Sequence, residues 1–275
     1  MESDLENLTA TAERVAVEAA DLVRDAYESM VAGTSVSVDT KSSETDVVTA
    51  VDTASERLIR ERLATLRPHD AVLGEEEGTR TAADSSEDTG VTWVVDPIDG
   101  TVNFLYGLPW FAVSVAAQID GATVAGAVVE PASGRRWTAT RGRGAWLDGR
   151  PLRCSAPESL GVSLLATGFA YQSEQRVRQA ELVARLLSEI RDIRRQGSAA
   201  LDLCAVAAGW VDAFVEHGLH RWDWAAGALV AAEAGAVVTL PGEDPALGED
   251  TILASAPSIA EPLRATLLEC GIADV

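Results

Sequence analysis

Cysteine is scarce in this chain of 275 residues, and so is lysine. The three cysteines, Cys154, Cys204 and Cys270, are odd in number and far apart in the sequence. Neither a disulfide framework nor a cysteine-ligated zinc site is therefore predicted. Such cysteine usage is typical of a reducing compartment, and we expect a cytoplasmic protein.

Long apolar runs are also absent. The longest candidate, residues 225–240, is interrupted by Glu233 and by glycines, so it is a poor match to a membrane-spanning helix. The first residues, MESDLENL, are acidic and polar, which is not typical of a secretory signal or a transit peptide. We expect neither a membrane partner nor a cleaved leader.

Positive charge is outnumbered by negative charge. The chain has 22 basic and 43 acidic residues, a formal net charge of −21, and only one of the basic residues, Lys41, is a lysine. A strongly acidic surface repels nucleic acid and anionic membranes, so we expect neither as a partner. The single lysine draws attention to position 41.

The apolar pattern predicts an N-terminal lobe that mixes helices with strands. Apolar residues make up 47% of the chain, which is enough for a substantial core. Helical spacing runs through Val31 and again over residues 49–66, and the apolar segment 71–74 indicates a buried strand. From Val91 onward the pattern indicates a meander of largely antiparallel strands, including one over residues 135–146.

The pattern changes again in the second half of the chain. Apolar strands there alternate with helices, two of which are predicted over residues 174–190 and from residue 258. The predicted fold class is therefore α/β, with an α+β lobe over residues 1–155 and an α/β lobe over residues 156–275. We expect the two lobes to form a layered sandwich with a cleft between them.

Carboxylates stand at the ends of predicted elements. Glu75 follows the strand AVLG, Asp96 and Asp99 follow TWVV, and Asp223 is predicted to cap a helix. Any one of them alone could be a turn residue or a helix cap. Four that converge would repel one another unless a cation lay among them. Ligands that offer only oxygen favour Mg²⁺ or Mn²⁺ over zinc.

The residues after Asp99 suggest a place for an anion. Gly100 and Thr101 are predicted to open a short helix, whose first N–H groups can bind negative charge. A metal cluster beside such N–H groups is typical of a phosphoester site. Metal ions would also allow so acidic a protein to bind an anionic substrate.

Several of these segments together resemble the signature motifs of the inositol monophosphatase family. The matching segments are KSSETDVVTAVD (41–52), GEE (74–76), DPIDGT (96–101), GSAALDLC (197–204), EHGLHRWD (216–223) and WDWAAG (222–227). They stand in the family's order, and the resemblance extends over residues 41–235. It implies a layered αβαβα sandwich of the sugar-phosphatase type.

The resemblance also implies a set of metal ligands. Glu75, Asp96 and the backbone carbonyl of Ile98 would bind a first Mg²⁺, and Asp96, Asp99 and Asp223 would bind a second. A third, weaker Mg²⁺ would lie near Glu75, and Mn²⁺ could replace Mg²⁺. The metal at Asp223 would stabilise the leaving alkoxide.

The same resemblance implies how the remaining motif residues act. A water polarised by Thr101, with Asp52 behind it, would attack phosphorus in line, and Glu75 is the third residue assigned to catalysis. Lys41 and Asp46 would support the phosphate region. The residues expected to face the substrate are Asp99, Gly100, Thr101, Ala199 and Glu216. A carboxylate at position 216 would accept hydrogen bonds from the hydroxyl groups of inositol and would repel a second phosphate on the substrate.

The function that these features predict is Mg²⁺-dependent hydrolysis of myo-inositol monophosphate to inositol and phosphate. By analogy we expect a homodimer that Li⁺ inhibits. The alternatives on the same fold are histidinol-phosphate phosphatase, fructose-1,6-bisphosphatase and 3′-phosphoadenosine phosphatase activities, and, in another class, a regulatory or scaffold protein. His217 and His220 lack a third histidine or cysteine partner, so we predict structural roles for them.

Overall fold

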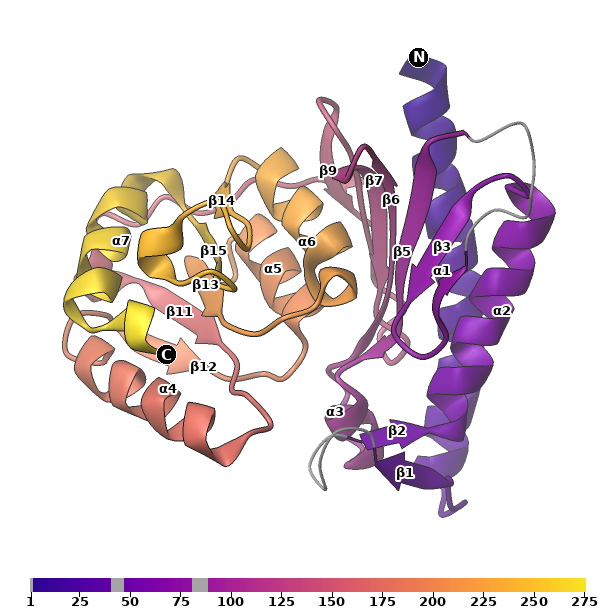
Figure 1. Cartoon of the computed structure of the whole chain (residues 1–275), viewed down its shortest axis with the longest axis horizontal. Helices are drawn as coiled ribbons and strands as arrows, with labels where there is room; N and C mark the ends of the chain where they lie inside the picture. Colours follow the sequence, from indigo (N-terminus) through magenta and orange to yellow (C-terminus); the bar gives the residue numbers. More distant parts are fainter. Residues whose placement is uncertain (1, 41–46, 81–88) are drawn as a thin grey trace.

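The structure is a computed structural model that describes residues 2–40, 47–80 and 89–275. Its elements form five layers in the order helix, sheet, helix, sheet, helix (Figure 1). This arrangement is the αβαβα sandwich that the motifs imply. Lys41 and Asp46 lie outside the described residues, so their predicted supporting roles have no structural counterpart here.

Pairs of helices make up the three helical layers. One pair, α1 (Glu2–Val31) and α2 (Ala50–Leu66), covers the outer face of the larger sheet. A second pair, α5 (Ala199–Ala207) and α6 (Arg221–Glu233), lies between the two sheets. The third pair, α4 (Ser173–Leu186) and α7 (Ala260–Glu269), packs on the outer face of the smaller sheet. None of the helices among the described residues is long and apolar enough to cross a membrane.

The larger sheet has eight strands in the order β10-β9-β8-β7-β6-β5-β3-β4. Their bounds are β3 (Ala71–Gly74), β4 (Gly78–Arg80), β5 (Val91–Asp99), β6 (Ala112–Ile119), β7 (Ala122–Val129), β8 (Arg136–Thr140), β9 (Gly144–Leu147) and β10 (Arg150–Pro151). Only β3 and β5 pair in parallel, so the predicted antiparallel meander is confirmed. The single strand predicted over residues 135–146 is wrong, because a turn over residues 141–143, with Gly142 at positive φ, divides it.

The smaller sheet has five strands in the order β12-β11-β13-β15-β14. Their bounds are β11 (Leu164–Thr167), β12 (Asp192–Arg194), β13 (Ala213–Glu216), β14 (Val237–Thr239) and β15 (Ile252–Ser255). The first three in that order run parallel, and β15 is antiparallel to both of its neighbours. β15, a fully buried strand of four residues between polar segments, was not predicted from the sequence.

Smaller differences concern short elements and helix ends. A two-stranded sheet of β1 (Val38–Thr40) and β2 (Val47–Thr49) precedes α2 and was not predicted. The helix predicted over residues 174–190 ends at Leu186. The last helix begins at Ala260 and not at residue 258, because a 3₁₀ turn with Pro257 at its first position comes before it.

Small residues allow the central helices to lie close to the larger sheet and to each other. A Cβ on Gly227 of α6 would lie 2.9 Å from both the Ala200 carbonyl and Leu203 Cβ of α5. A Cβ on Gly126 of β7 would lie 3.1 Å from Ala226 Cα. Close packing of this kind fixes the position of the N-terminus of α6 relative to the larger sheet.

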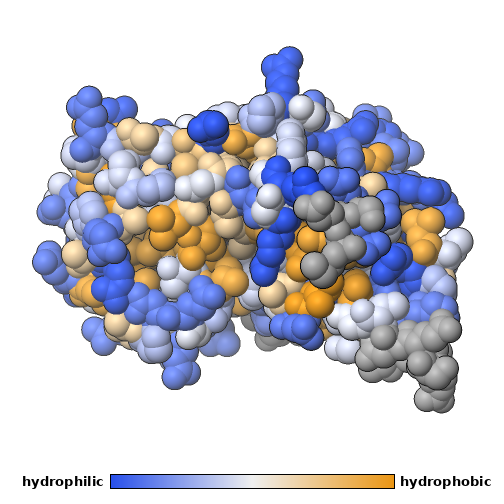
Figure 2. Space-filling view, turned by 90° about the horizontal axis from the view of Figure 1, so that it is seen from above, coloured by the Kyte–Doolittle hydropathy of each residue, from blue (hydrophilic) through white to orange (hydrophobic). Residues whose placement is uncertain are grey.

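The surface is largely hydrophilic at its periphery. Seen from above in Figure 2, hydrophilic residues lie around the periphery of the molecule, and apolar residues gather over the middle of the left half of the view. Most acidic residues in the described part of the chain are at least partly exposed.

Candidate active site

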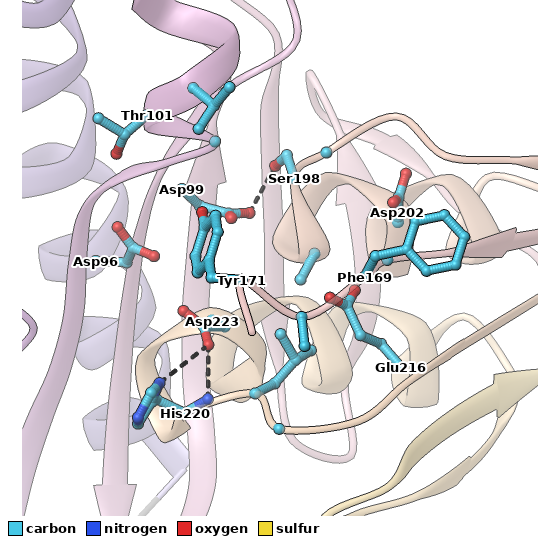
Figure 3. A pocket seen from close by; sticks show the side chains of 18 of the residues that line it. Asp96, Asp99, Thr101, Phe169, Tyr171, Ser198, Asp202, Glu216, His220 and Asp223 are labelled. Atoms are coloured by element: carbon cyan, nitrogen blue, oxygen red, sulfur yellow. Dashed lines mark hydrogen bonds and ion pairs between the residues drawn. The ribbon is translucent and has the colours of Figure 1, made fainter. Parts of the chain in front are cut away.

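A cavity of about 650 Å³ is lined by residues from both halves of the chain, between Val47 and Asp223. All four predicted metal ligands line it, namely Glu75, Asp96, Asp99 and Asp223. They come from separate elements: Glu75 follows β3, Asp96 and Asp99 end β5, and Asp223 lies in the first turn of α6. Because β3 and β5 are parallel neighbours, their carboxyl ends meet at one edge of the sheet. Figure 3 shows Asp96, Asp99 and Asp223 around a common space.

An irregularity in β5 brings both of its aspartates to the cavity. Two residues three apart on a regular strand point to opposite faces. The pairing of β5 with β6 shifts register between Asp96 and Asp99, and the backbone N–H of Ile98 donates to Asp96 Oδ1 at 3.0 Å. The carbonyl of Pro97 accepts the Ser55 hydroxyl at 3.1 Å. The segment that reads as a turn in the sequence is therefore a bulge that turns two carboxylates toward one site.

Thr101 and Asp52 form the contact that the motifs imply. Thr101 Oγ1 lies 2.9 Å from Asp52 Oδ1 and 3.0 Å from the Ile98 carbonyl oxygen. The hydroxyl has a single proton, so it donates a hydrogen bond to one of them at a time. Asp52 is fully buried, and its Oδ2 accepts the backbone N–H of Thr49 at 2.9 Å. Thr49 is the N-cap of α2, so the start of that helix fixes Asp52 behind Thr101.

Gly100 occupies the turn between these groups, and its conformation requires glycine. Its φ is +94°, and a Cβ there would lie 3.1 Å from the Gly197 carbonyl. It is the N-cap of the short helix α3 (Thr101–Leu105), as predicted. Asp223, by contrast, is not the N-cap of α6. His220 holds that position, and Asp223 is the third residue of the helix, where its Oδ2 accepts the His220 N–H at 2.6 Å.

The cavity carboxylates affect one another's ionisation. Burial, and then the charges of Glu75, Asp99 and Asp223, raise the pKa of Asp96 well above its usual value. Burial, with Asp99 and Glu75, does the same for the pKa of Asp223. Burial raises the pKa of Asp99 to about 6, although the Ser198 hydroxyl, which donates at 2.6 Å, opposes the change. Three neighbouring carboxylates therefore hold protons more strongly than isolated ones do.

These residues fit a hard divalent cation by their chemistry. They offer only oxygen, and their repulsion is of the kind that a bound cation relieves. As they stand, no three His, Cys, Asp or Glu side chains in the described part of the chain are close enough together to hold a metal ion. Side-chain rotations would be needed to bring three of them around one ion.

The opposite wall of the cavity carries the predicted substrate residues. Ala199 begins α5 and lines the cavity, as does Glu216 at the end of β13. The Glu216 carboxylate lies against Gly168, where an added Cβ would be 2.0 Å from Glu216 Oε1. Burial raises the pKa of Glu216 to about 8, with the charge of Arg195 lowering it and that of Asp99 raising it.

Asp202 is a cavity residue that sequence analysis missed. It lies on α5, one turn after Ser198, and it is buried beside the cavity. Burial, and then Glu216 and Asp99, raise the pKa of Asp202 well above its usual value. Among the described residues, Asp202 Oδ1 and Trp110 Nε1 are both buried without a hydrogen bond of good geometry. Its position in GSAALDLC, on the same helix face as the predicted Ala199 region, was the available signal.

Both histidines of the EHGLHRWD segment line the same cavity. His217 is buried, and burial lowers its pKa. His220 is exposed and stacks on Trp222, with ring centroids 4.8 Å apart and planes 7° from parallel. The predicted structural role agrees with the position of His220 as helix cap and stacking partner.

Comparisons with known proteins agree with the geometry. The model of the Inositol monophosphatase family matches residues 4–273. The Inositol-1-monophosphatase of Mycobacterium leprae (strain TN) is 51% identical, over 97% of this chain and 95% of the relative. The Nus factor SuhB of Escherichia coli (strain K12) is 43% identical, over 82% of each chain.

Solved structures show the same fold. The structure of Mycobacterium tuberculosis SuhB matches with a TM-score of 0.80 and 45% identity, and the two chains cover 97% of each other. The inositol monophosphatase from Anabaena (Nostoc) sp. PCC 7120 matches with a TM-score of 0.80, 30% identity and the same coverage. With nearly the whole chain matched in sequence and in structure, this protein belongs to the inositol monophosphatase family.

Proposed function

We propose that this protein is a Mg²⁺-dependent phosphomonoesterase that hydrolyses myo-inositol monophosphate to inositol and phosphate. The observation that carries the proposal is the convergence of Glu75, Asp96, Asp99 and Asp223 on one cavity. The relative from Mycobacterium leprae, with about half of its residues identical, is named an inositol-1-monophosphatase.

The ligand set of the proposal follows the positions of the carboxylates. Glu75, Asp96 and the Ile98 carbonyl would hold one Mg²⁺, and Asp96, Asp99 and Asp223 a second; a third, weaker ion would lie near Glu75, and Mn²⁺ would substitute. When bound, Mg²⁺ supplies a Lewis acid that lowers the pKa of a coordinated water and neutralises charge on the phosphate. Asp96 lies between the other carboxylates in this scheme, in agreement with the three charges that raise its pKa.

Thr101 and Asp52 would move the proton of the attacking water. When the Thr101 hydroxyl donates to Asp52 Oδ1, at 2.9 Å, the lone pairs of Thr101 Oγ1 can accept a hydrogen bond from water. Burial raises the pKa of Asp52, which makes its carboxylate a better proton acceptor. A proton would thus pass from water to Thr101 as Thr101 passes its own to Asp52.

The substrate would lie between the aspartates and the wall formed by α5 and β13. The backbone N–H groups of Gly100 and Thr101 would contact the phosphate. Ala199 leaves room for a ring, and Asp99 and Glu216 would bind its hydroxyl groups. A second phosphate would approach the Glu216 carboxyl group, which disfavours a bisphosphate substrate. We keep Lys41 and Asp46 as supporting residues of the phosphate region.

Other parts of the proposal rest on the sequence and on the family. They are a homodimer, inhibition by Li⁺, a cytoplasmic location, and a division into lobes at residues 1–155 and 156–275. The proposal that nucleic acid is not a partner rests on the net charge of −21. One relative is named a Nus factor, so retention of labelled RNA by the purified protein at physiological salt would contradict that part.

Phosphate release across a panel of substrates tests the activity. The panel is inositol 1-phosphate, histidinol phosphate, fructose 1,6-bisphosphate and 3′-phosphoadenosine 5′-phosphate, each with MgCl₂ and with EDTA, and Asp96→Asn serves as the blank. We expect Mg²⁺-dependent release that is fastest from inositol 1-phosphate. Faster release from another member would change the substrate and keep the mechanism. Release from none, with Asp96→Asn equal to wild type, would favour a regulatory or scaffold protein.

A further inference from the structure

One face of α2 contacts both loops that carry the proposed metal ligands. The buried residues of this helix are Asp52, Ser55, Glu56, Ile59, Arg60 and Leu63. Asp52 accepts the Thr101 hydroxyl, and Ser55 donates to the Pro97 carbonyl, so the first turns of α2 hold the loop after β5. The next polar residue on that face, Glu56, contacts the other loop.

Glu56 binds the backbone of the turn that follows β3. Its Oε2 accepts the N–H of Glu76 at 2.7 Å, and its Oε1 accepts the N–H of Glu77 at 2.9 Å. The side chain of Glu56 is fully buried. Two N–H groups on one carboxylate fix the direction of the backbone at residues 76 and 77, and Glu75 is the residue immediately before them.

Arg60, one helical turn after Glu56, completes the contact. Its Nε donates to Glu56 Oε1 at 2.8 Å, and its Nη2 donates to the Gly78 carbonyl at 2.5 Å. The charge of Arg60 compensates the buried charge of Glu56. Together the two side chains bind three consecutive residues of the turn, from Glu76 to Gly78.

The glycine of the GEE segment has a physical reason in this contact. A Cβ on Gly74 would lie 2.3 Å from Glu56 Oε1, so any other residue there would displace the carboxylate. The φ of Gly74 is not in the left-handed region, so space, and not backbone conformation, requires glycine. Glycine at position 74 thus leaves space at the end of β3 for the side chain of Glu56.

We propose that Glu56 is a positioning residue of the metal site: by binding the N–H groups of Glu76 and Glu77 it holds Glu75 toward the cavity. This inference rests on the proposed function, because Glu75 must be a metal ligand for its orientation to affect metal binding. Residues that orient a ligand typically contribute 10- to 100-fold to metal affinity.

Asp70 offers a matched control. Like Glu56 it is a buried carboxylate that accepts from an arginine, here Arg67 Nε at 2.7 Å, and it also accepts from Trp93 Nε1 at 2.8 Å. It stands just before β3, whereas Glu75 stands just after it. Loss of a charge at either place disturbs the same strand, but only Glu56 contacts the turn that follows Glu75.

The test is calorimetric titration of MgCl₂ into wild type, Glu56→Gln and Asp70→Asn, together with hydrogen exchange of the Glu76 and Glu77 amides. Glutamine keeps the size of the side chain but turns one acceptor into a donor. We expect Glu56→Gln to weaken Mg²⁺ binding by about 10- to 100-fold and to speed exchange of both amides. We expect Asp70→Asn to lower the melting temperature and leave both measurements unchanged.

The outcomes separate the two proposals. If wild type binds no Mg²⁺, the proposed function fails and this inference fails with it. If wild type binds Mg²⁺ and Glu56→Gln binds it equally well, Glu56 is a structural residue only and the inference alone is overturned. Should Glu56→Gln not fold, Arg60→Gln takes its place, with an expected weakening of about 10-fold in Mg²⁺ affinity; unchanged affinity in that variant also overturns the inference.

Discussion

Two groups of buried carboxylates in this protein have contrasting surroundings. Three that do not line the cavity each pair with an arginine, in the pairs Glu56–Arg60, Asp70–Arg67 and Glu130–Arg135, at 2.7, 2.7 and 2.6 Å. In the cavity, Asp96, Asp99 and Asp223 pair with no arginine in the described part of the chain, and the charges that raise their pKa values include those of Glu75 and of one another.

Burial alone does not distinguish the two groups. Asp96 and Glu130 are each 1% exposed, yet Glu130 accepts from Arg135 and from Trp137 Nε1, at 2.9 Å. A buried carboxylate is costly unless a positive charge or several donors compensate it. The chain supplies that compensation at the structural positions. In the cavity we infer that a cation from solution supplies this compensation. The arginine-paired carboxylates therefore serve stability, and the cavity carboxylates serve function.

The largest expected effect is that of Asp96→Asn. The substitution removes a carboxylate shared by both principal metal positions, and we expect phosphate release to fall by about 1,000-fold or more. Because it also removes a repelling charge, the metal-free variant should melt at a higher temperature than metal-free wild type. A lower melting temperature in EDTA would show that Asp96 is compensated like Glu130, and the comparison would fail.

Mg²⁺ itself should stabilise the protein, and more so at higher pH. Burial and neighbouring charges raise the folded pKa of Asp99 to about 6, from 3.8. The folded state therefore binds more protons than the unfolded state between these values, and the metal-free protein loses stability as pH rises through that range. Mg²⁺ requires the ionised carboxylates, so its effect grows over the same range.

Thermal melts with EDTA or MgCl₂ at pH 5, 6, 7 and 8 measure this effect. At a Mg²⁺ concentration of 100 times its dissociation constant we expect about 2.7 kcal/mol of stabilisation at pH 8, and less at pH 5. Asp96→Asn serves as the control in which most of the shift is absent. A shift that is equal at all four pH values would mean that Mg²⁺ binds elsewhere.

A variant of an arginine-paired carboxylate tests the same difference between the two groups. Glu130→Gln removes the charge that Arg135 contacts and one acceptor for its donors, so it should destabilise the protein by about 2 kcal/mol at pH 7. The Mg²⁺-induced shift in melting temperature should stay as in wild type. If that shift disappeared, Glu130 would belong with the cavity group despite its arginine.

The sequence revealed the chemistry of the cavity better than its shape. Carboxylates at strand ends, together with the DPIDGT and GEE motifs, predicted residues that line the cavity. The structure explains why Glu75 lies near Asp96 and Asp99: β3 and β5 are parallel neighbours that end at one edge of the sheet. The bulge that turns Asp96 and Asp99 the same way could not be predicted, since it depends on the pairing of β5 with β6. The same applies to β15, whose three apolar residues and one serine identify a strand only once its partner β13 is known.

Asp202 and Glu56 show why the rest of the site was missed. Each lies on a helix whose apolar residues already account for its buried face. From the sequence, a single acidic residue on such a helix is therefore expected to be exposed to solvent. Their importance comes from contacts with segments distant in sequence, such as the 20 and 21 residues that separate Glu56 from Glu76 and Glu77. Periodicity has no information about such contacts.

The smallest effect is expected for Glu216→Gln. This variant tests whether Glu216 belongs with the arginine-paired carboxylates or with the cavity carboxylates. Burial raises its folded pKa to about 8, against 4.5 when unfolded. Between these values the folded protein holds a proton that the unfolded chain has lost, so stability falls as pH rises from 4.5 to 8. Glutamine cannot ionise, so the variant should lack this loss.

Melts of metal-free wild type and Glu216→Gln should therefore coincide near pH 5 and separate toward pH 8, with the variant higher. Because Glu216 is only half-buried, we expect a difference of about 1 kcal/mol, or about 2–4 °C. Parallel curves at all pH values would mean that Arg195 compensates the charge fully, as Arg135 does for Glu130. Diverging curves would place Glu216 with the cavity carboxylates, whose charge no arginine compensates.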